Sequence, residues 1–264
     1  MARIYRSQTD LIELMIDHGL AVLARDGLGG KPLTFTRVFD HIEAAGLPRV
    51  KKGSVLGPNR PWVSQEDYVT DVELAAIHRW ADTSQIDPLV AAEAAAVLSC
   101  ADVTTLDGRE ATVRELCRRV AAASLRSNRS HPLFQIVVAL WGRVASSPHG
   151  DRADLLGVAL REARRRSVES GVAFTYRPLA QFVGMRGRDG LWSQEEALRL
   201  ASQGASALAE GYALDMEFAG DDEVFLLPTG PGGEMREWTT YAMGAEAIIT
   251  RFLELDPDWC APGA

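Results

Sequence analysis

Residues 33–71 read LTFTRVFDHIEAAGLPRVKKGSVLGPNRPWVSQEDYVTD, and this stretch decides the fold that the sequence predicts. Thr34 is a suitable N-cap, because its hydroxyl can accept a hydrogen bond from a backbone N–H of the first helical turn. Apolar side chains then recur at helical spacing from Phe35 to Ala45. Gly46 suits the left-handed position that follows a helix. The pattern therefore predicts a helix from Thr34 to about Ala45.

The segment after Gly46 is short and basic, with Arg49, Lys51 and Lys52 ahead of Gly53-Ser54. A compact helix here would present lysine and serine side chains to the groove of a DNA duplex. The segment therefore predicts the second helix of a helix-turn-helix motif.

Ser64 begins a capping box, because Asp67 follows three residues later and can return a hydrogen bond to the Ser64 backbone. Val63 and Tyr68 occupy the positions of a hydrophobic staple around this cap. A further helix is expected from Ser64 to about Ala81. It would complete a DNA-binding head together with the helices before it.

Helical periodicity continues on both sides of this stretch, so the fold class is expected to be all-α. A first helix is expected over residues 9–26, and a helix after Asp87-Pro88 should run to about residue 99. Later helices are expected over 110–124, 132–146, 152–169, 194–216 (after a second capping box, Ser193 and Glu196) and about 238–252. VFLLP at 224–228 is the best strand candidate, while 172–191 and 220–234 have the composition of linkers.

Composition is that of an ordinary globular protein, with 47% apolar and 24% charged residues in 264. No run approaches the roughly 20 apolar residues of a membrane span, and the N-terminus lacks the apolar core of a signal peptide. We therefore expect a cytoplasmic protein that does not enter a membrane. Residues 1–65 hold nine Lys or Arg and six Asp or Glu, a balance of +3, so the whole-chain charge of −8 leaves −11 for the rest. A basic head on an acidic body is typical of a DNA-binding domain joined to a sensing domain.

The order of these signals resembles the TetR family of bacterial transcriptional regulators. The matching elements are Leu33-Thr34, Ala45-Gly46-Leu47, Lys52-Gly53-Ser54-Val55, Trp62 and Ser64-Gln65-Glu66-Asp67. The resemblance implies a helix-turn-helix three-helix head in residues 1–66 and a helical ligand-binding and dimerisation domain in residues 67–264. It implies a ligand-responsive DNA-binding regulator, with repression as the expected sense, that acts as a homodimer on an operator.

The resemblance also implies which residues meet DNA. The expected DNA contacts are Thr34, Thr36, Arg37, Lys51, Lys52, Ser54, Val55, Arg60 and Trp62, and Arg3 and Arg6 could form a basic arm. This chain departs from the family in two places. Six residues, 47–52, separate Ala45-Gly46 from Gly53-Ser54, where family members usually have about three. The step from Gly53 to Trp62 is also longer than usual, and it contains Pro58, where a helix interior would lose about 3 kcal/mol or more.

The remaining helices are expected to hold an unidentified small-molecule effector and the dimer interface. A pocket would draw on large side chains, with His131 or Arg143 as polar orienting groups. The pocket candidates are Trp80, His131, Phe134, Trp141, Phe174, Tyr176, Phe182 and Met185. Small residues over 194–216 and an apolar stripe on the last helix are compatible with a four-helix dimer interface, although both helices could instead pack within the monomer. The interface candidates are Ala201, Ala205, Leu208, Trp238, Tyr241, Ala245 and Ile249.

The sequence contains no motif typical of a metal site, a hydrolase or a phosphate-binding loop, so we expect no enzymatic activity, metal or cofactor. The three cysteines are far apart and in no CxxC spacing, and the five histidines form no HExxH. GxSxG and a phosphate-binding loop are also missing. The alternative is an all-helical small-molecule-binding or scaffolding protein whose degenerate head no longer reads an operator. A helical enzyme ranks third.

Overall fold

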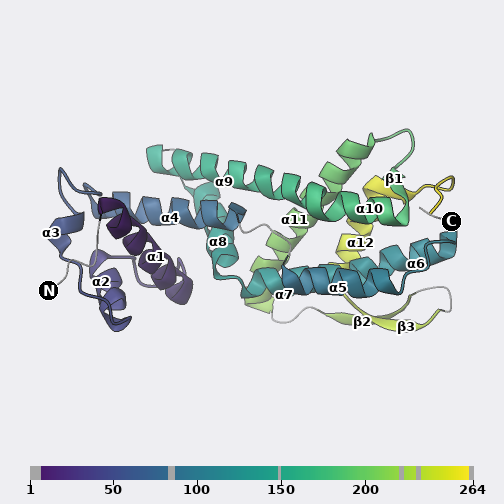
Figure 1. The fold of residues 1–264 in the computed structure, drawn as a ribbon, viewed down its shortest axis with the longest axis horizontal. Coiled ribbons are helices and arrows are strands. Elements are labelled where there is room, and N and C mark those ends of the chain that lie inside the picture. Colours follow the sequence, from purple (N-terminus) through teal and green to yellow (C-terminus); the bar gives the residue numbers. More distant parts are fainter. Residues whose placement is uncertain (1–6, 83–86, 148–149, 220–222, 230–232, 262–264) are drawn as a thin grey trace. The chain divides into compact units, whose positions relative to one another are not determined.

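A computed structural model describes residues 7–82, 87–147, 150–219, 223–229 and 233–261 of the chain. It is predominantly helical, as predicted, and its few strands are short (Figure 1). The chain divides into two compact units. Residues 1–83 and 132–164 form the first unit, and residues 84–131 and 165–264 form the second. None of the helices within the described ranges is both long and apolar enough to cross a membrane.

The first unit contains helices from two separate parts of the sequence. They are α1 (Gln8–Asp26), α2 (Phe35–Ala44), α3 (Lys52–Val55), α4 (Gln65–Asp82), α8 (Pro132–Ser146) and the first part of α9 (Asp151–Gly171). Helix α4 packs against both α1 and α8, and one apolar core joins them. The predicted boundary at residue 66 therefore differs from the division in the structure, because α4 lies in the same core as the helices before it.

Local caps account for where these helices begin. Thr34 Oγ1 accepts a hydrogen bond from the Arg37 backbone N–H at 3.4 Å, and α2 begins at the next residue, as predicted. In the predicted capping box, Asp67 N–H donates to Ser64 Oγ at 3.0 Å and Ser64 N–H donates to the Asp67 carboxylate at 2.9 Å. The staple is not formed, because Val63 is 69% exposed while Tyr68 is buried.

Close contact between α1 and α4 depends on a glycine. A Cβ at Gly19 would lie 2.5 Å from the Tyr68 hydroxyl oxygen, so only glycine admits this ring. The hydroxyl donates to the Met15 carbonyl at 2.7 Å, which satisfies the one polar atom of a buried side chain. The ring also stacks on Phe35 of α2, with centroids 4.7 Å apart. Helices α1, α2 and α4 are therefore held by one aromatic cluster.

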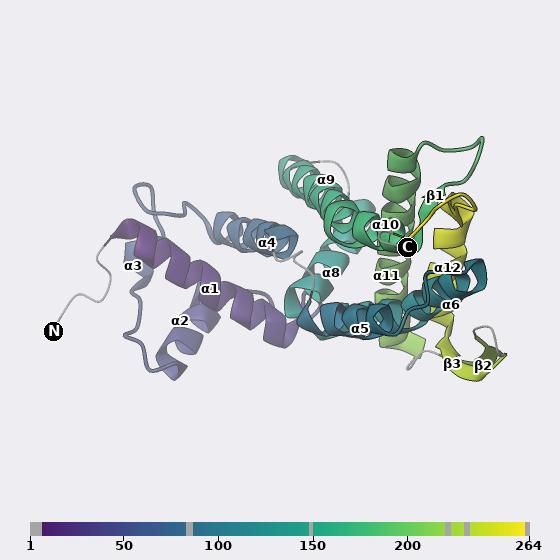
Figure 2. The same cartoon turned by 45° about the vertical axis from the view of Figure 1, so that its right-hand side comes forward.

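The second unit combines helices with two small antiparallel sheets. Its elements are α5 (Pro88–Ser99), α6 (Leu106–Leu116), the π-helical turn η1 (Cys117–Ala121), α7 (Ala122–Ser130), the end of α9, a second π-helical turn η2 (Val172–Tyr176), α10 (Arg177–Val183), β1 (Met185–Gly187), α11 (Gln194–Ala219), β2 (Val224–Pro228), β3 (Met235–Thr239), α12 (Thr240–Phe252) and β4 (Leu253–Leu255). Helices α11 and α12 lie side by side in this unit (Figure 2).

The strands of the second unit correct part of the sequence interpretation. Strand β2 is the predicted VFLLP strand, and it pairs with β3, with Phe225 opposite Trp238. Trp238 therefore lies in a strand rather than in the last helix, which begins two residues later. The predicted linker over 172–191 contains η2, α10 and β1 instead, and β1 pairs with β4. The helix expected over 110–124 begins earlier, at Leu106, because the Thr105 hydroxyl caps it.

Candidate functional site

Three exposed basic side chains lie in or near the short helix α3 in the sequence. Lys51 and Lys52 are exposed at its start, and Arg60 is exposed on the loop that follows. That loop folds back, because the Trp62 N–H donates to the Val55 carbonyl at 3.1 Å and the Gly57 N–H donates to the Trp62 carbonyl at 2.9 Å. We call Lys51, Lys52 and Arg60 the basic corner. No described acidic residue forms an ion pair with any of them.

Helix α3 itself is a single turn of four residues. The Ser54 hydroxyl donates a hydrogen bond to the Lys51 carbonyl at 2.6 Å. Val55 is fully buried and Trp62 is 2% exposed, so both belong to the core. The prediction that they contact DNA is corrected on this point, because a side chain enclosed by its own chain cannot reach a groove.

Of the DNA contacts predicted at and near the start of α2, one is exposed and two are engaged in contacts within the chain. Thr36 is exposed, whereas Thr34 holds the helix cap. Arg37 pairs with Asp26 at the end of α1 and donates to the Pro32 carbonyl at 2.8 Å. Its guanidinium thus fixes the connection between α1 and α2. Arg3 and Arg6 lie outside the described residues.

A pair of histidines also joins α1 to α2. The Nδ1 atoms of His18 and His41 lie 2.8 Å apart, a distance that needs one ring to donate and the other to accept. Burial lowers the pKa of His18, and the charge of His41 lowers it further, while Asp17, which pairs with Arg79, opposes the shift. Two protonated rings could not share this contact.

We expect the first unit to lose stability as the pH falls through about 6.5, the ordinary pKa of histidine. Because the folded pKa of His18 is lowered, the unfolded chain binds more protons, so the free energy of unfolding decreases toward low pH, by at most about 1.4 kcal/mol per pH unit for one proton. Urea unfolding between pH 5 and pH 8 measures this slope. His18→Gln should flatten it, whereas His78→Gln, at an exposed position of α4, should leave it as in the wild type. An unchanged slope in His18→Gln would contradict the assignment.

A buried carboxylate lies between two arginines in the same unit. Glu73 of α4 is 1% exposed, and its Oε2 lies 2.7 Å from Arg143 Nη2 of α8 and 2.9 Å from Arg152 Nη2 of α9. Arg152 also reaches the exposed Glu66 at 3.2 Å. Burial alone would lower the pKa of Arg152, but the hydrogen bonds and charges of Glu73 and Glu66 raise it. The three residues Glu73, Arg143 and Arg152 are called the buried triad below.

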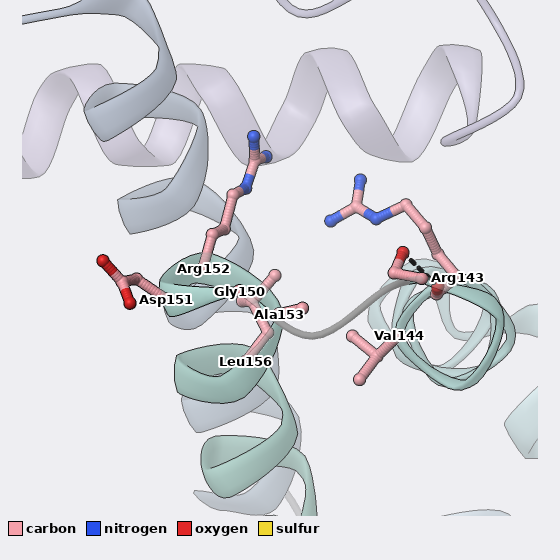
Figure 3. Close-up of a pocket in the computed structure, with 8 residues that line it drawn as sticks. Arg143, Val144, Gly150, Asp151, Arg152, Ala153 and Leu156 are labelled. Atoms are coloured by element: carbon pink, nitrogen blue, oxygen red, sulfur yellow. Dashed lines mark hydrogen bonds between the residues drawn. The ribbon is translucent and has the colours of Figure 1, made fainter.

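The two arginines of the buried triad also line an open cavity of about 470 Å³ (Figure 3). The end of α8 contributes Arg143, Val144 and Ser147, and the start of α9 contributes Gly150, Asp151, Arg152, Ala153 and Leu156. Both guanidinium groups extend to the same side of the cavity, while the Asp151 carboxylate points away from them (Figure 3). None of the eight predicted pocket residues lines this cavity, but Arg143, which the sequence suggested as a polar orienting group, does.

The predicted pocket residues are divided between the two units. Trp80, Phe134 and Trp141 belong to the first unit, and His131, Phe174, Tyr176, Phe182 and Met185 belong to the second. Phe174 and Phe182 are exposed, and Phe134 is buried in the core with Trp80 nearby, their ring centroids 6.3 Å apart. Neither unit by itself therefore brings the predicted set together. Sequence reasoning missed Glu73, whose signal was an acidic residue on the buried stripe that contains Val72, Ala76 and Ile77.

The predicted dimer residues are largely used within the chain. Ala201, Trp238, Tyr241 and Ala245 are buried, so their side chains pack within this chain, and the homodimer stays a prediction. Ala205, Leu208 and Ile249 are half-buried. The small residues of α11 and α12 admit each other's side chains: a Cβ at Gly204 would lie 2.9 Å from Ile248, and one at Gly244 would lie 3.0 Å from Leu208.

Groups that could carry metal or thiol chemistry are sparse. The described part of the chain contains no cluster of three or more His, Cys, Asp or Glu side chains arranged to hold a metal ion. Burial raises the pKa of the Cys117 thiol to about 12, with a contribution from the charge of Glu246. This thiol is therefore protonated at neutral pH and weakly nucleophilic. Comparison with known protein families, with curated proteins and with solved structures finds no match to the chain.

Proposed function

We propose that this chain is a DNA-binding transcriptional regulator, as its motif-level resemblance to TetR regulators implies. The basic corner carries the proposal, because its three exposed cations have no acidic partner among the described residues and lie beside the packed helices α1, α2 and α4. Phosphate contacts by such side chains supply most of the affinity of a protein for duplex DNA. Thr36, exposed on α2, and the backbone at Gly53 would lie closest to the bases.

The short length of α3 limits how many base pairs one DNA-binding head could contact. A four-residue helix rises only about 6 Å, whereas the major groove is about 12 Å wide, so one head would read few base pairs. Useful specificity would then require two heads on a symmetric site, that is, a homodimer. The proposed role also requires a cytoplasmic location. The same short helix favours the second candidate function, an all-helical ligand-binding or scaffolding protein whose head no longer reads an operator.

The double substitution Lys51→Gln/Lys52→Gln tests the proposal. We expect it to weaken binding to a random-sequence duplex by about tenfold or more at low salt, and to reduce the slope of log affinity against log salt by about 2, because two phosphate contacts disappear. Fluorescence anisotropy titrations at roughly 50 to 200 mM salt measure both the affinity and its dependence on salt.

The matched control is Arg126→Gln/Arg251→Gln, which removes the same charge from exposed positions of the second unit. It should bind as the wild type does. If the wild type binds no duplex at low salt, or if both double variants bind equally well, the second candidate function replaces the first. Circular dichroism on both variants checks that the helices remain intact.

A further inference from the structure

We propose that the arginine-lined cavity at the end of α8 and the start of α9 binds a small organic carboxylate with an apolar body. The proposal rests on two properties of the cavity that occur together. Its wall combines guanidinium groups with aliphatic side chains, and its volume of about 470 Å³ falls within the range of small-molecule sites. The binding step is independent of any role in DNA recognition.

Arg143 supplies the donors for the carboxylate. A guanidinium carries five N–H donors in a planar fork that matches a carboxylate. The Nη2 atom of Arg143 is enclosed and forms an ion pair with Glu73 Oε2 at 2.7 Å, so a ligand would meet the Nε and Nη1 groups of this 40% exposed side chain, for which the described residues supply no hydrogen-bond acceptor. Arg152, by contrast, already donates to Glu73 at 2.9 Å and to Glu66 at 3.2 Å. Arg143 is therefore the residue with donor capacity to spare.

The acidic groups around the cavity leave room for an added anion. Glu73 is shared between the two guanidiniums, and Glu66 is an exposed partner of Arg152 alone. Asp151 lines the cavity, but its carboxylate points away from the guanidiniums (Figure 3). A ligand carboxylate next to Arg143 would thus meet two cations and one buried, already shared anion.

The rest of the wall selects for an apolar body. Val144 from α8 and Ala153 and Leu156 from α9 line the cavity. The Ser147 hydroxyl donates to the Arg143 carbonyl at 2.7 Å, so its proton is not free for a ligand. A short alkyl or aryl chain attached to the carboxylate would cover the half-buried Val144 and Ala153 and gain the free energy of apolar burial, while Leu156 already lies in the core behind them.

The buried triad connects this cavity to α4. A ligand carboxylate would compete with Glu73 for Arg143, and Glu73 is on the same helix as Tyr68, which packs on α1 and α2. A ligand carboxylate that draws Arg143 away from Glu73 would favour a second arrangement of this side chain and could thereby shift the position of α4. If the proposed DNA-binding function is right, this contact is the route by which the carboxylate acts on the head.

Isothermal titration calorimetry on the full chain tests the site with hexanoate and benzoate, each compared with its neutral amide. We expect each carboxylate to bind at least tenfold more tightly than its amide, and hexanoate to bind more tightly than acetate. Arg143→Gln should weaken carboxylate binding at least tenfold. Arg161→Gln, which removes an exposed arginine further along α9, is the control and should bind as the wild type does. Equal binding of carboxylate and amide, or unchanged binding by Arg143→Gln, would overturn the proposal.

If the Arg143→Gln protein does not fold, a second variant still tests the site. Glu73→Gln removes the internal competitor of the ligand, so a folded Glu73→Gln protein should bind hexanoate more tightly than the wild type. Weaker or equal binding would count against the site. Because calorimetry needs no DNA, a failure here leaves the DNA-binding proposal standing. Conversely, if the protein binds the carboxylate but no DNA duplex, the cavity proposal stands and the DNA-binding proposal fails.

Discussion

Replacing Trp62 with alanine should lower the free energy of unfolding of the first unit by about 3 to 5 kcal/mol. The indole is 2% exposed and lies 4.8 Å from the Tyr68 ring and 6.1 Å from the Phe35 ring, centroid to centroid. Its Nε1 donates to Asp71 at 2.8 Å. Alanine would therefore leave a cavity in the aromatic cluster and an unpaired carboxylate beside it. Urea unfolding followed by circular dichroism measures the loss.

Two neighbouring substitutions separate the contributions. Trp62→Phe retains ring packing but loses the hydrogen bond to Asp71, so it should cost only about 1 kcal/mol plus a smaller packing loss. Val63→Ala, at an exposed position, should change stability by less than about 0.5 kcal/mol. If Trp62→Ala were as stable as the wild type and only DNA affinity fell, the indole would be a surface contact and its burial in the core would be refuted.

Replacing Glu73 with alanine should destabilise the first unit by about 2 to 3 kcal/mol. The change leaves the guanidiniums of Arg143 and Arg152 facing each other without the carboxylate that neutralises them. The cost falls below that of a fully buried ion pair, because these side chains are 40% and 33% exposed and can be solvated again. Thermal and urea unfolding should both show the loss, more strongly at low salt than at high salt.

The charges around Glu73 provide the controls. Glu66→Ala removes an exposed partner of the same Arg152 and should cost less than about 1 kcal/mol. Replacing the whole buried triad, as Glu73→Leu/Arg143→Met/Arg152→Met, should recover stability to within about 1 kcal/mol of the wild type, because no buried charge is then left unpaired and the released Glu66 is exposed to water. A triple variant as unstable as Glu73→Ala would show that the triad contributes through its shape rather than its charge.

Local chemistry made much of the helical framework predictable. The hydroxyls of Thr34 and Ser64 bind backbone N–H groups three residues ahead, and Asp87 caps α5 through the Leu89 N–H at 2.7 Å. Such caps depend only on residues close in sequence, so they can be recognised without knowledge of the fold. The end of α2 was predictable in the same way, because Gly46, just beyond its C-cap, adopts a positive φ of 78° that favours glycine.

Long-range packing decided what the sequence did not predict. Trp62 resembled a contact residue in its motif, but Phe35 and Tyr68, on two other helices, enclose it. The partner of the VFLLP strand was missed, because MREWT at 235–239 is mostly polar and acquires its strand only by pairing with β2. The buried triad unites residues 73, 143 and 152, a separation that no local pattern reveals.

The discontinuity of the first unit has a consequence for how the protein is made. Its core joins Met15 and Val72 from one segment to Leu140 and Leu160 from another, with residues 84–131 inserted between them. During translation the N-terminal helices cannot complete their core until the chain has grown past residue 164. A fragment ending near residue 83 would expose the apolar faces of α1 and α4 and is expected to aggregate. On the ribosome, the first unit therefore cannot fold completely until the inserted segment and residues 132–164 have been synthesised.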